Sequence, residues 1–133
     1  FETANCFRER NMATVRYMVN DVSDSCEFYV KHFGFELENN FRHMAILKKD
    51  DLNLWLAGPP SSAGQPMLDG TKPVPGGWSR FVFEIEDIDA TVATLKSQGM
   101  KFKNEILRGG GRAQILCEDP SGNVIDLMQR DTK

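Results

Sequence analysis

The chain repeats one order of elements, and this repeat limits the folds open to its 133 residues more than any other feature. In each copy, an apolar alternating strand leads to a segment with helical periodicity, and three further strand-like segments follow. The expected strands are residues 14–20, 35–41, 43–49 and 52–58 in the first copy and 80–86, 101–107, 112–118 and 123–129 in the second. The pattern predicts two βαβββ modules and an α+β fold class, because neither module could bury the faces of its helix and sheet alone.

The two expected helices carry their own start and stop signals. Asp21 or Ser23 can cap the first helix, and Asp87 begins the second. Gly34 and Gly99 can supply the left-handed residue at which each helix ends. The apolar residues that recur with helical spacing are Val22, Cys26, Tyr29, Val30 and Phe33 in the first helix and Ile88, Val92 and Leu95 in the second. They predict the face that each helix packs against its sheet.

The repeat also sets the expected domain boundaries. The expected divisions are one domain over residues 12–133, with module one at 13–58, a connection at 59–77 and module two at 78–130. The connection is rich in Gly and Pro, which argues against regular structure, and both a plain crossover and a lid over a pocket stay open. Residues 1–11 have no clear periodicity, so we expect Met12 to be the natural start and the preceding residues to be an extension.

Composition narrows the classes of function. A formal net charge of −3 without a block of Lys and Arg argues against a nucleic-acid partner. No apolar run approaches the roughly 20 residues of a membrane span, and the N-terminal segment lacks the pattern of a signal peptide. Cys6, Cys26 and Cys117 are odd in number, widely spaced and without a CxxC pair. We therefore expect a cytoplasmic protein with no disulfide framework, in which Cys26 and Cys117 are core residues.

The tandem repeat closes on the segment EDPSGNVIDLMQ, Glu118–Gln129, and this combination resembles the vicinal oxygen chelate superfamily. That superfamily includes glyoxalase I, the bleomycin-resistance proteins and the extradiol dioxygenases. The matching segments are VNDVSDSCEFYVKHFGFEL in the first copy and IEDIDATVATLKSQGMKF with DPSGNVIDL in the second. The resemblance implies that the curved sheets of the two modules pair around a cleft, in which enzymes of the family bind one divalent metal. Homodimers are common among small members, so the resemblance leaves a homodimer open.

The resemblance also implies which residues stand where relatives place their metal ligands. The four positions are Thr14, Trp55, Arg80 and Asp126. Only Asp126 is a good ligand, because Arg is a fixed cation, Trp offers only a donor and Thr a weak neutral oxygen. We therefore expect a member that lacks most of the usual ligands and has no metal cofactor. His32 and His43 are interpreted as surface residues that do not restore the site.

Strand alternation indicates which side chains face the cleft, because successive residues of a strand point to opposite faces. The residues on the helix side are Val15, Tyr17, Val19, Leu52, Leu54, Leu56, Phe81, Phe83, Ile85, Ile125 and Leu127. The expected ligand-binding residues on the cleft side are Thr14, Arg16, Met18, Trp55, Arg80, Val82, Glu84, Gln114, Asp126 and Met128. Asn53, Ala57, Val124 and Leu116 share that side. Charged groups set in an apolar wall are typical of small-molecule pockets.

Asp126 is a carboxylate within an apolar strand, and we interpret it as the partner of Arg80. Two versions stay open: a purely structural ion pair, or an Arg80 with part of its guanidinium able to bind an anionic or carbonyl-bearing ligand. The Gly-rich stretch at 108–112 is interpreted as a flexible turn, since no helix follows it as a phosphate-binding loop requires.

Three functions fit these features. The one we favour is a metal-independent protein of the bleomycin-resistance type, whose cleft binds or sequesters a small organic molecule. The alternative is a glyoxalase-type lyase, isomerase or dioxygenase, which needs a metal or a base such as Glu84 or Asp126. The third is a scaffold whose cleft is closed by packing. The residues alone leave open whether the protein is an enzyme.

Overall fold

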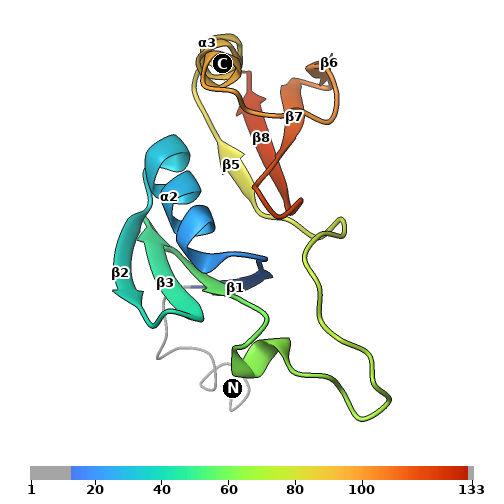
Figure 1. Ribbon diagram of the computed structural model, residues 1–133. Helices are drawn as coiled ribbons and strands as arrows, with labels where there is room; N and C mark the ends of the chain where they lie inside the picture. The colour runs from blue at the N-terminus through green and yellow to red at the C-terminus, as the bar shows by residue number, and fades with distance from the viewer. Residues whose placement is uncertain (1–12, 132–133) are drawn as a thin grey trace, which may run out of the picture. The chain divides into compact units, whose positions relative to one another are not determined.

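The computed structural model describes residues 13–131, and the chain divides into two compact units between Val74 and Pro75 (Figure 1). The first unit contains β1 (Ala13–Met18), α2 (Val22–Phe33), β2 (Glu36–Asn40), β3 (Met44–Lys49) and β4 (Leu52–Ala57). The second contains β5 (Val82–Glu84), α3 (Ile88–Ser97), β6 (Leu107–Gly109), β7 (Arg112–Glu118) and β8 (Val124–Arg130). The segment after β4, still in the first unit, contains one short 3₁₀ helix, η1 (Ser62–Gly64), where the composition predicted no regular structure at all.

Both units have the same sheet topology. The strand order is β1-β4-β3-β2 in the first sheet and β5-β8-β7-β6 in the second. In each sheet the first and last strands of the unit pair in parallel, and every other pair is antiparallel. The predicted α+β class and tandem βαβββ order are therefore confirmed. The helices of the described chain are also too short and too polar to cross a membrane.

The helix boundaries follow from the capping residues. An oxygen of Asp21 accepts a hydrogen bond from the Asp24 N–H at 2.9 Å, so Asp21 rather than Ser23 caps α2. Asp87 caps α3 in the same way, by accepting from the Ala90 N–H at 3.0 Å. Gly34 ends α2 in the left-handed conformation, with φ of 71°.

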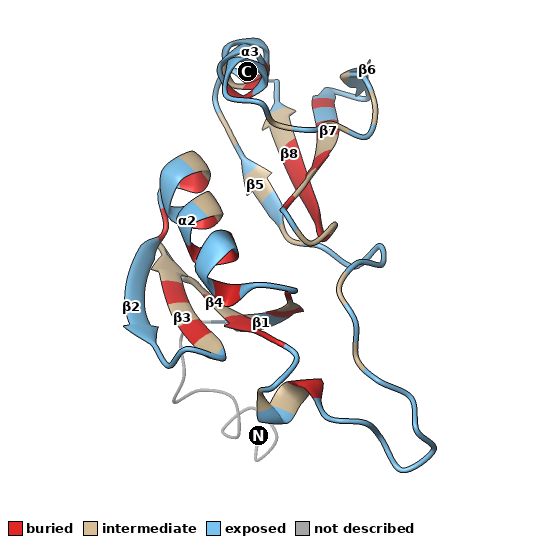
Figure 2. Cartoon of the chain, viewed as in Figure 1, coloured by how far each residue is buried: buried red, intermediate tan, exposed pale blue. Residues whose placement is uncertain are grey.

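Each helix covers one face of its own sheet. In the first unit, α2 packs against β2, β3 and β4, and in the second, α3 packs against β8. Residues coloured as buried recur along α2, β3 and β8 (Figure 2). The predicted helix-side residues Tyr17, Leu54, Leu56, Ile125 and Leu127 are buried as expected. One prediction for α2 was wrong, because Val30 is 42% exposed and Ser25 is buried in its place.

The predicted strand at 101–107 was also wrong. Only Leu107 of that range belongs to β6, and Phe102 makes an isolated bridge to Cys117. The physical reason is the side chain of Asn104, whose Oδ1 accepts the hydrogen bond of the Leu116 N–H at 3.0 Å. A strand would supply a backbone carbonyl there, so the side-chain bond replaces part of the ladder.

The Gly-rich stretch forms a tight hairpin turn between β6 and β7. Gly109 pairs with Arg112, which leaves Gly110 and Gly111 as the two turn residues. Both have positive φ, 60° and 77°, as a two-residue hairpin turn of the primed type requires. The flanking pairs of this turn have a defined strand register.

Candidate functional site

The strand register places predicted ligand-binding residues of the second unit side by side on one sheet face. Asp126 of β8 lies opposite Val82 of β5 and Leu116 of β7. In the next row, Met128 lies opposite Glu84 and Gln114. Residues directly opposite one another in a ladder point to the same side. This face is the one away from α3. Oε1 of Gln129 accepts from the N–H of Ile88, the first residue of α3, at 2.7 Å, and Gln129 alternates with Met128 along the strand.

Arg80 and Asp126 form the predicted ion pair. The Nε of Arg80 donates to Oδ2 of Asp126 at 3.0 Å, and its Nη1 donates to the Trp78 carbonyl oxygen at 3.0 Å. The Asp126 side chain is 7% exposed, whereas that of Arg80 is 33% exposed. Oδ1 of Asp126 is buried and has no hydrogen-bond partner among the described residues. A carboxylate in this setting is costly to bury, so the single bond from Arg80 is its main compensation.

Strand β5 is shorter than the predicted strand at 80–86, because it begins only at Val82. Arg80 therefore lies in the segment that leads into the strand. Its position depends on the hydrogen bonds of that segment, including the one that the Asp126 N–H donates to the Phe81 carbonyl oxygen at 3.3 Å.

The turn before β8 is bonded to the segment that leads to Arg80 and also leads directly to Asp126. The carboxylate of Asp119 accepts from the N–H groups of Ser121 and Asn123 and from Nδ2 of Asn123, each at 2.9 Å. Oδ1 of Asn123 in turn accepts from the N–H of Gly76 at 2.8 Å. The chain just before Arg80 is thereby tied to the turn just before Asp126. Sequence reasoning read this motif as a turn and missed Asn123 as a link, because its partner Gly76 is 47 positions away and no local pattern marks the contact.

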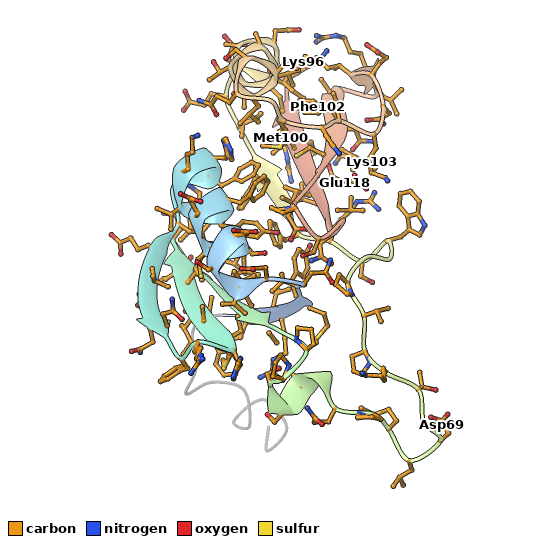
Figure 3. All side chains as sticks on the ribbon, in the orientation of Figure 1. Asp69, Lys96, Met100, Phe102, Lys103 and Glu118 are labelled. Atoms are coloured by element: carbon orange, nitrogen blue, oxygen red, sulfur yellow. The ribbon has the colours of Figure 1, made fainter. Side chains whose placement is uncertain are left out.

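A second group of side chains lies around Trp78, which sequence reasoning also missed. Trp78 is 66% exposed, and the Nζ of Lys103 lies over its ring at 5.2 Å from the centroid. The same Nζ bonds Oε2 of Glu118 at 2.9 Å, and both side chains are labelled in Figure 3. Glu118 lies opposite Val124 in the ladder, so this group neighbours the row of Asp126.

Glu84, the second candidate for a catalytic base, lies in a different environment. Its carboxylate pairs with Nη2 of Arg130 at 3.1 Å, and its side chain is 56% exposed. A base that relies on exclusion of water needs a buried carboxylate. The environment of Asp126 meets that condition, and the environment of Glu84 does not.

In the first unit, the register brings the predicted residues together in the same way. Arg16 of β1 lies opposite Trp55 of β4, and its guanidinium carbon is 5.1 Å from the centroid of the indole ring. Thr14 lies opposite Asn53, and Met18 lies opposite Ala57 on the same side of the sheet. These residues share the face of their own sheet that α2 does not cover.

A pocket of about 240 Å³ lies elsewhere in the first unit, at the start of α2. Its lining includes Asp21, Arg42, His43 and Gly58, and it contains none of the expected ligand-binding residues of the described chain. Arg42 and His43 are both exposed there.

His32 is half-buried and packs edge-on against Phe28, with 5.1 Å between ring centroids.

The residues at the four positions that the family resemblance assigns to metal ligands do not fit a divalent cation. Thr14 and Trp55 supply no anionic donor, and Arg80 places a cation on the one carboxylate, Asp126. Within residues 13–131, no three His, Cys, Asp or Glu side chains lie close enough together to hold a metal ion.

The two described cysteines are core residues, as predicted. Burial raises the pKa of the Cys26 thiol. Burial, and to a lesser extent the carboxylates of Asp126, Asp119 and Glu118, raises the pKa of the Cys117 thiol to about 12. Neither thiol has the lowered pKa of a nucleophile. Cys6 lies outside the described residues.

Known proteins share this fold. The chain is 27% identical over 134 residues to the probable chloroplastic lactoylglutathione lyase of Arabidopsis thaliana, a match that covers 92% of the chain and 36% of that protein. It therefore spans about a third of the length of this curated relative. A lactoylglutathione lyase from Agrobacterium tumefaciens has a similar structure, with a TM-score of 0.69, 18% identity and coverage of 89% and 92% of the two chains. An antibiotic-binding protein from a Streptomyces species, TnmS3, gives a TM-score of 0.67, with 24% identity and coverage of 90% and 95%.

The model of one family, described as the glyoxalase/bleomycin resistance protein/dioxygenase superfamily, matches residues 11–127. This range covers the first βαβββ unit and the second as far as Leu127, within the strand that carries Asp126. The family resemblance seen in the sequence is thus confirmed over most of the chain. The protein belongs to the glyoxalase/bleomycin resistance protein/dioxygenase superfamily.

Proposed function

We propose that this protein binds a small organic molecule without a metal, and that Arg80 and Asp126 are the polar centre of the binding site. The observation that carries the proposal is the ion pair itself, formed by two residues that the family resemblance assigns to metal-ligand positions. A guanidinium that is one third exposed can still donate to a ligand, whereas it would repel a divalent cation.

The neighbouring residues supply the apolar wall that such a site needs. Val82, Leu116 and Met128 lie in the rows around Asp126 on the helix-free face of the second sheet. A few polar groups set among apolar side chains are the usual composition of a small-molecule site. The similarity in fold to an antibiotic-binding protein is compatible with this function.

The test is a binding screen on metal-free protein. The protein is treated with chelator, its metal content is measured by mass spectrometry, and a library of small organic acids, amides and ketones is screened by NMR. Arg80→Lys keeps the charge but removes the planar donor edge. Arg108→Lys makes the same change in the exposed pair between Arg108 and Asp89 and serves as the control.

We expect compounds that bind wild-type protein and the Arg108→Lys variant without metal and bind at least about tenfold more weakly to Arg80→Lys. Absence of any binder in the wild type would refute the proposal. So would binding that appears only after a divalent metal is added.

A second candidate function is lyase chemistry, which the 27% identity to a probable lactoylglutathione lyase favours. The donor set described above does not fit the metal that the family's enzymes use, so no catalytic step is derived. Lactoylglutathione lyase activity can be assayed with Zn, Ni, Co and Mn added in turn. Turnover that Asp126→Ala abolishes would replace the binding proposal by this one.

A further inference from the structure

Arg112 and Arg130 lie directly opposite each other on the neighbouring strands β7 and β8. They belong to the sheet face that carries Asp126, because Asp126, Met128 and Arg130 alternate along β8. Side chains at opposite positions begin about 5 Å apart, and two like charges placed there destabilise a sheet. This arrangement therefore costs stability unless negative groups balance both cations.

The carboxylates of the described chain balance only one of these two cations. Oε2 of Glu84 pairs with Nη2 of Arg130 at 3.1 Å. Arg112 forms no ion pair within residues 13–131. One positive charge is thus left over, which matches the single charge of a carboxylate better than the nearly double charge of a phosphate monoester.

Both arginine side chains are accessible to a ligand. The Arg130 side chain is 59% exposed, and Arg112 is exposed as well. β7 lies between β8 and β6 (Figure 1), and the residue opposite Arg112 on β6 is Gly109. A methyl group in place of the Gly109 hydrogen would meet no atom of the described chain within 4 Å, its chain neighbours aside. The row of the two arginines is therefore open on its β6 side.

The adjoining row of the same sheet face supplies an apolar surface. Met128 lies opposite Gln114, and Gln114 lies opposite Leu107. Leu107 is 55% exposed, and Met128 is half-buried. In the row of Asp126, Val82 continues this surface and is 49% exposed. The apolar surface thus begins beside the two arginines and continues to the row of Asp126.

We propose that Arg112 and Arg130 bind the carboxylate of an organic acid, whose apolar part lies over Leu107 and Met128. The inference rests on the proposed binding function, because it extends the same sheet face and names the class of ligand. The planar guanidinium of Arg112 donates two parallel N–H bonds to the two carboxylate oxygens, a common geometry of Arg with carboxylates. The bound carboxylate then removes the repulsion between the two cations.

This carboxylate site is separate from the ion pair of Arg80 and Asp126. Asp126 and Arg130 are four residues apart on β8, which is about 13 Å along an extended strand. A small acid therefore occupies the carboxylate site without reaching Arg80, and the two sites can be tested independently.

The experiment compares three matched probes: hexanoate, hexanamide and acetate. Hexanamide keeps the apolar chain without the charge, and acetate keeps the charge without most of the chain. Dissociation constants are measured by NMR titration on metal-free protein at neutral pH and constant ionic strength.

The variants separate the charge from the apolar contact. Arg112→Gln removes one cation, and Leu107→Ser removes an apolar side chain, both at exposed positions. Arg108→Gln is the matched control, because Arg108 lies on the same hairpin but opposite the buried Ala113, on the other face of the sheet. Its own ion pair is with Asp89.

We expect wild-type protein to bind hexanoate at least about tenfold more tightly than either hexanamide or acetate. Arg112→Gln should weaken hexanoate binding at least about tenfold and leave hexanamide binding unchanged. Leu107→Ser should weaken the binding of hexanoate and leave that of acetate unchanged. Arg108→Gln should behave like wild type.

Equal binding of hexanoate and hexanamide to wild-type protein, equal losses in Arg112→Gln and Arg108→Gln, or no binding of hexanoate would overturn the carboxylate site. The result is separable from failure of the proposed function. Compounds whose binding depends on Arg80 and not on Arg112 leave that function standing and remove only this inference. Hexanoate binding that depends on Arg112, in a protein for which no library compound depends on Arg80, keeps the carboxylate site and removes Arg80 and Asp126 as the polar centre.

Discussion

The two residues of the ion pair between Arg80 and Asp126 differ in how much each needs its partner to keep its charge stable in the folded protein. The side chain of Asp126 is almost closed to solvent, while a third of the Arg80 side chain is accessible. Removal of one partner therefore leaves two different situations. A bare carboxylate would stay buried in one variant, and a guanidinium that can turn to water would remain in the other.

Arg80→Ala is expected to lower the free energy of unfolding by about 3–5 kcal/mol, because Asp126 then loses its main compensation for burial. Asp126→Ala should cost less, about 1–2 kcal/mol, since Arg80 can be hydrated. Arg108→Ala, in a pair whose side chains are 55% and 68% exposed, should cost no more than about 1 kcal/mol. Urea denaturation of the three variants measures these differences.

The double variant Arg80→Met with Asp126→Leu tests the same argument even where Arg80→Ala does not fold. It replaces the pair by apolar side chains and should recover most of the lost stability. Equal losses for Arg80→Ala and Asp126→Ala would contradict the argument from unequal burial.

At the scale of elements, the helices were predicted well because several local signals coincide at each one. Asp21 and Asp87 cap their first turns, and periodic apolar residues mark the buried faces. The strand predicted at 101–107 had only alternation as its support. Alternation does not show where the backbone hydrogen bonds go, and here the side chain of Asn104 takes one of them.

Asp87→Ala is expected to destabilise the protein by about 1 kcal/mol, because the N–H of Ala90 loses its acceptor at the start of α3. Asp87→Ser keeps a capping oxygen and should retain most of the stability. The two variants are compared by urea denaturation. If Ser and Ala cost the same, the cap does not stabilise this helix.

At the scale of the whole molecule, the repeat accounts for two compact units with the same topology. Each unit has a helix on only one face of its sheet, and each falls in the size range in which a single core is marginal. The sequence predicts one domain over residues 12–133. Cooperative unfolding of both units is therefore expected.

The two tryptophans of the chain allow the cooperativity of unfolding to be measured, because Trp55 lies in the first unit and Trp78 in the second. Trp55→Phe leaves a fluorescence reporter in the second unit, and Trp78→Phe leaves one in the first. Circular dichroism follows the loss of helix in each variant and so gives that variant's own unfolding midpoint. In each variant, the midpoint of the fluorescence transition should coincide with the midpoint from circular dichroism. Separate midpoints within one variant would mean that the units unfold independently.

The sequence by itself determined the features that depend on near neighbours in the chain. Caps act over three residues, helical faces repeat within four, and strand faces alternate every second residue, so each leaves a local pattern. For this reason the α+β class and both helices could be predicted. The pairing of Arg80 with Asp126, which are 46 positions apart, was predicted from the family resemblance and not from a local pattern. The family could be recognised from the same patterns.

Only the tertiary structure decided the contacts between distant residues. Asn123 and Gly76 are 47 positions apart, and nothing local indicates that one holds the other. The same holds for the choice of a single bond between Arg80 and Asp126, and for the bond from Arg80 to the Trp78 carbonyl. Which oxygen of a carboxylate is satisfied depends on packing from several elements at once, and a linear pattern contains no record of that packing.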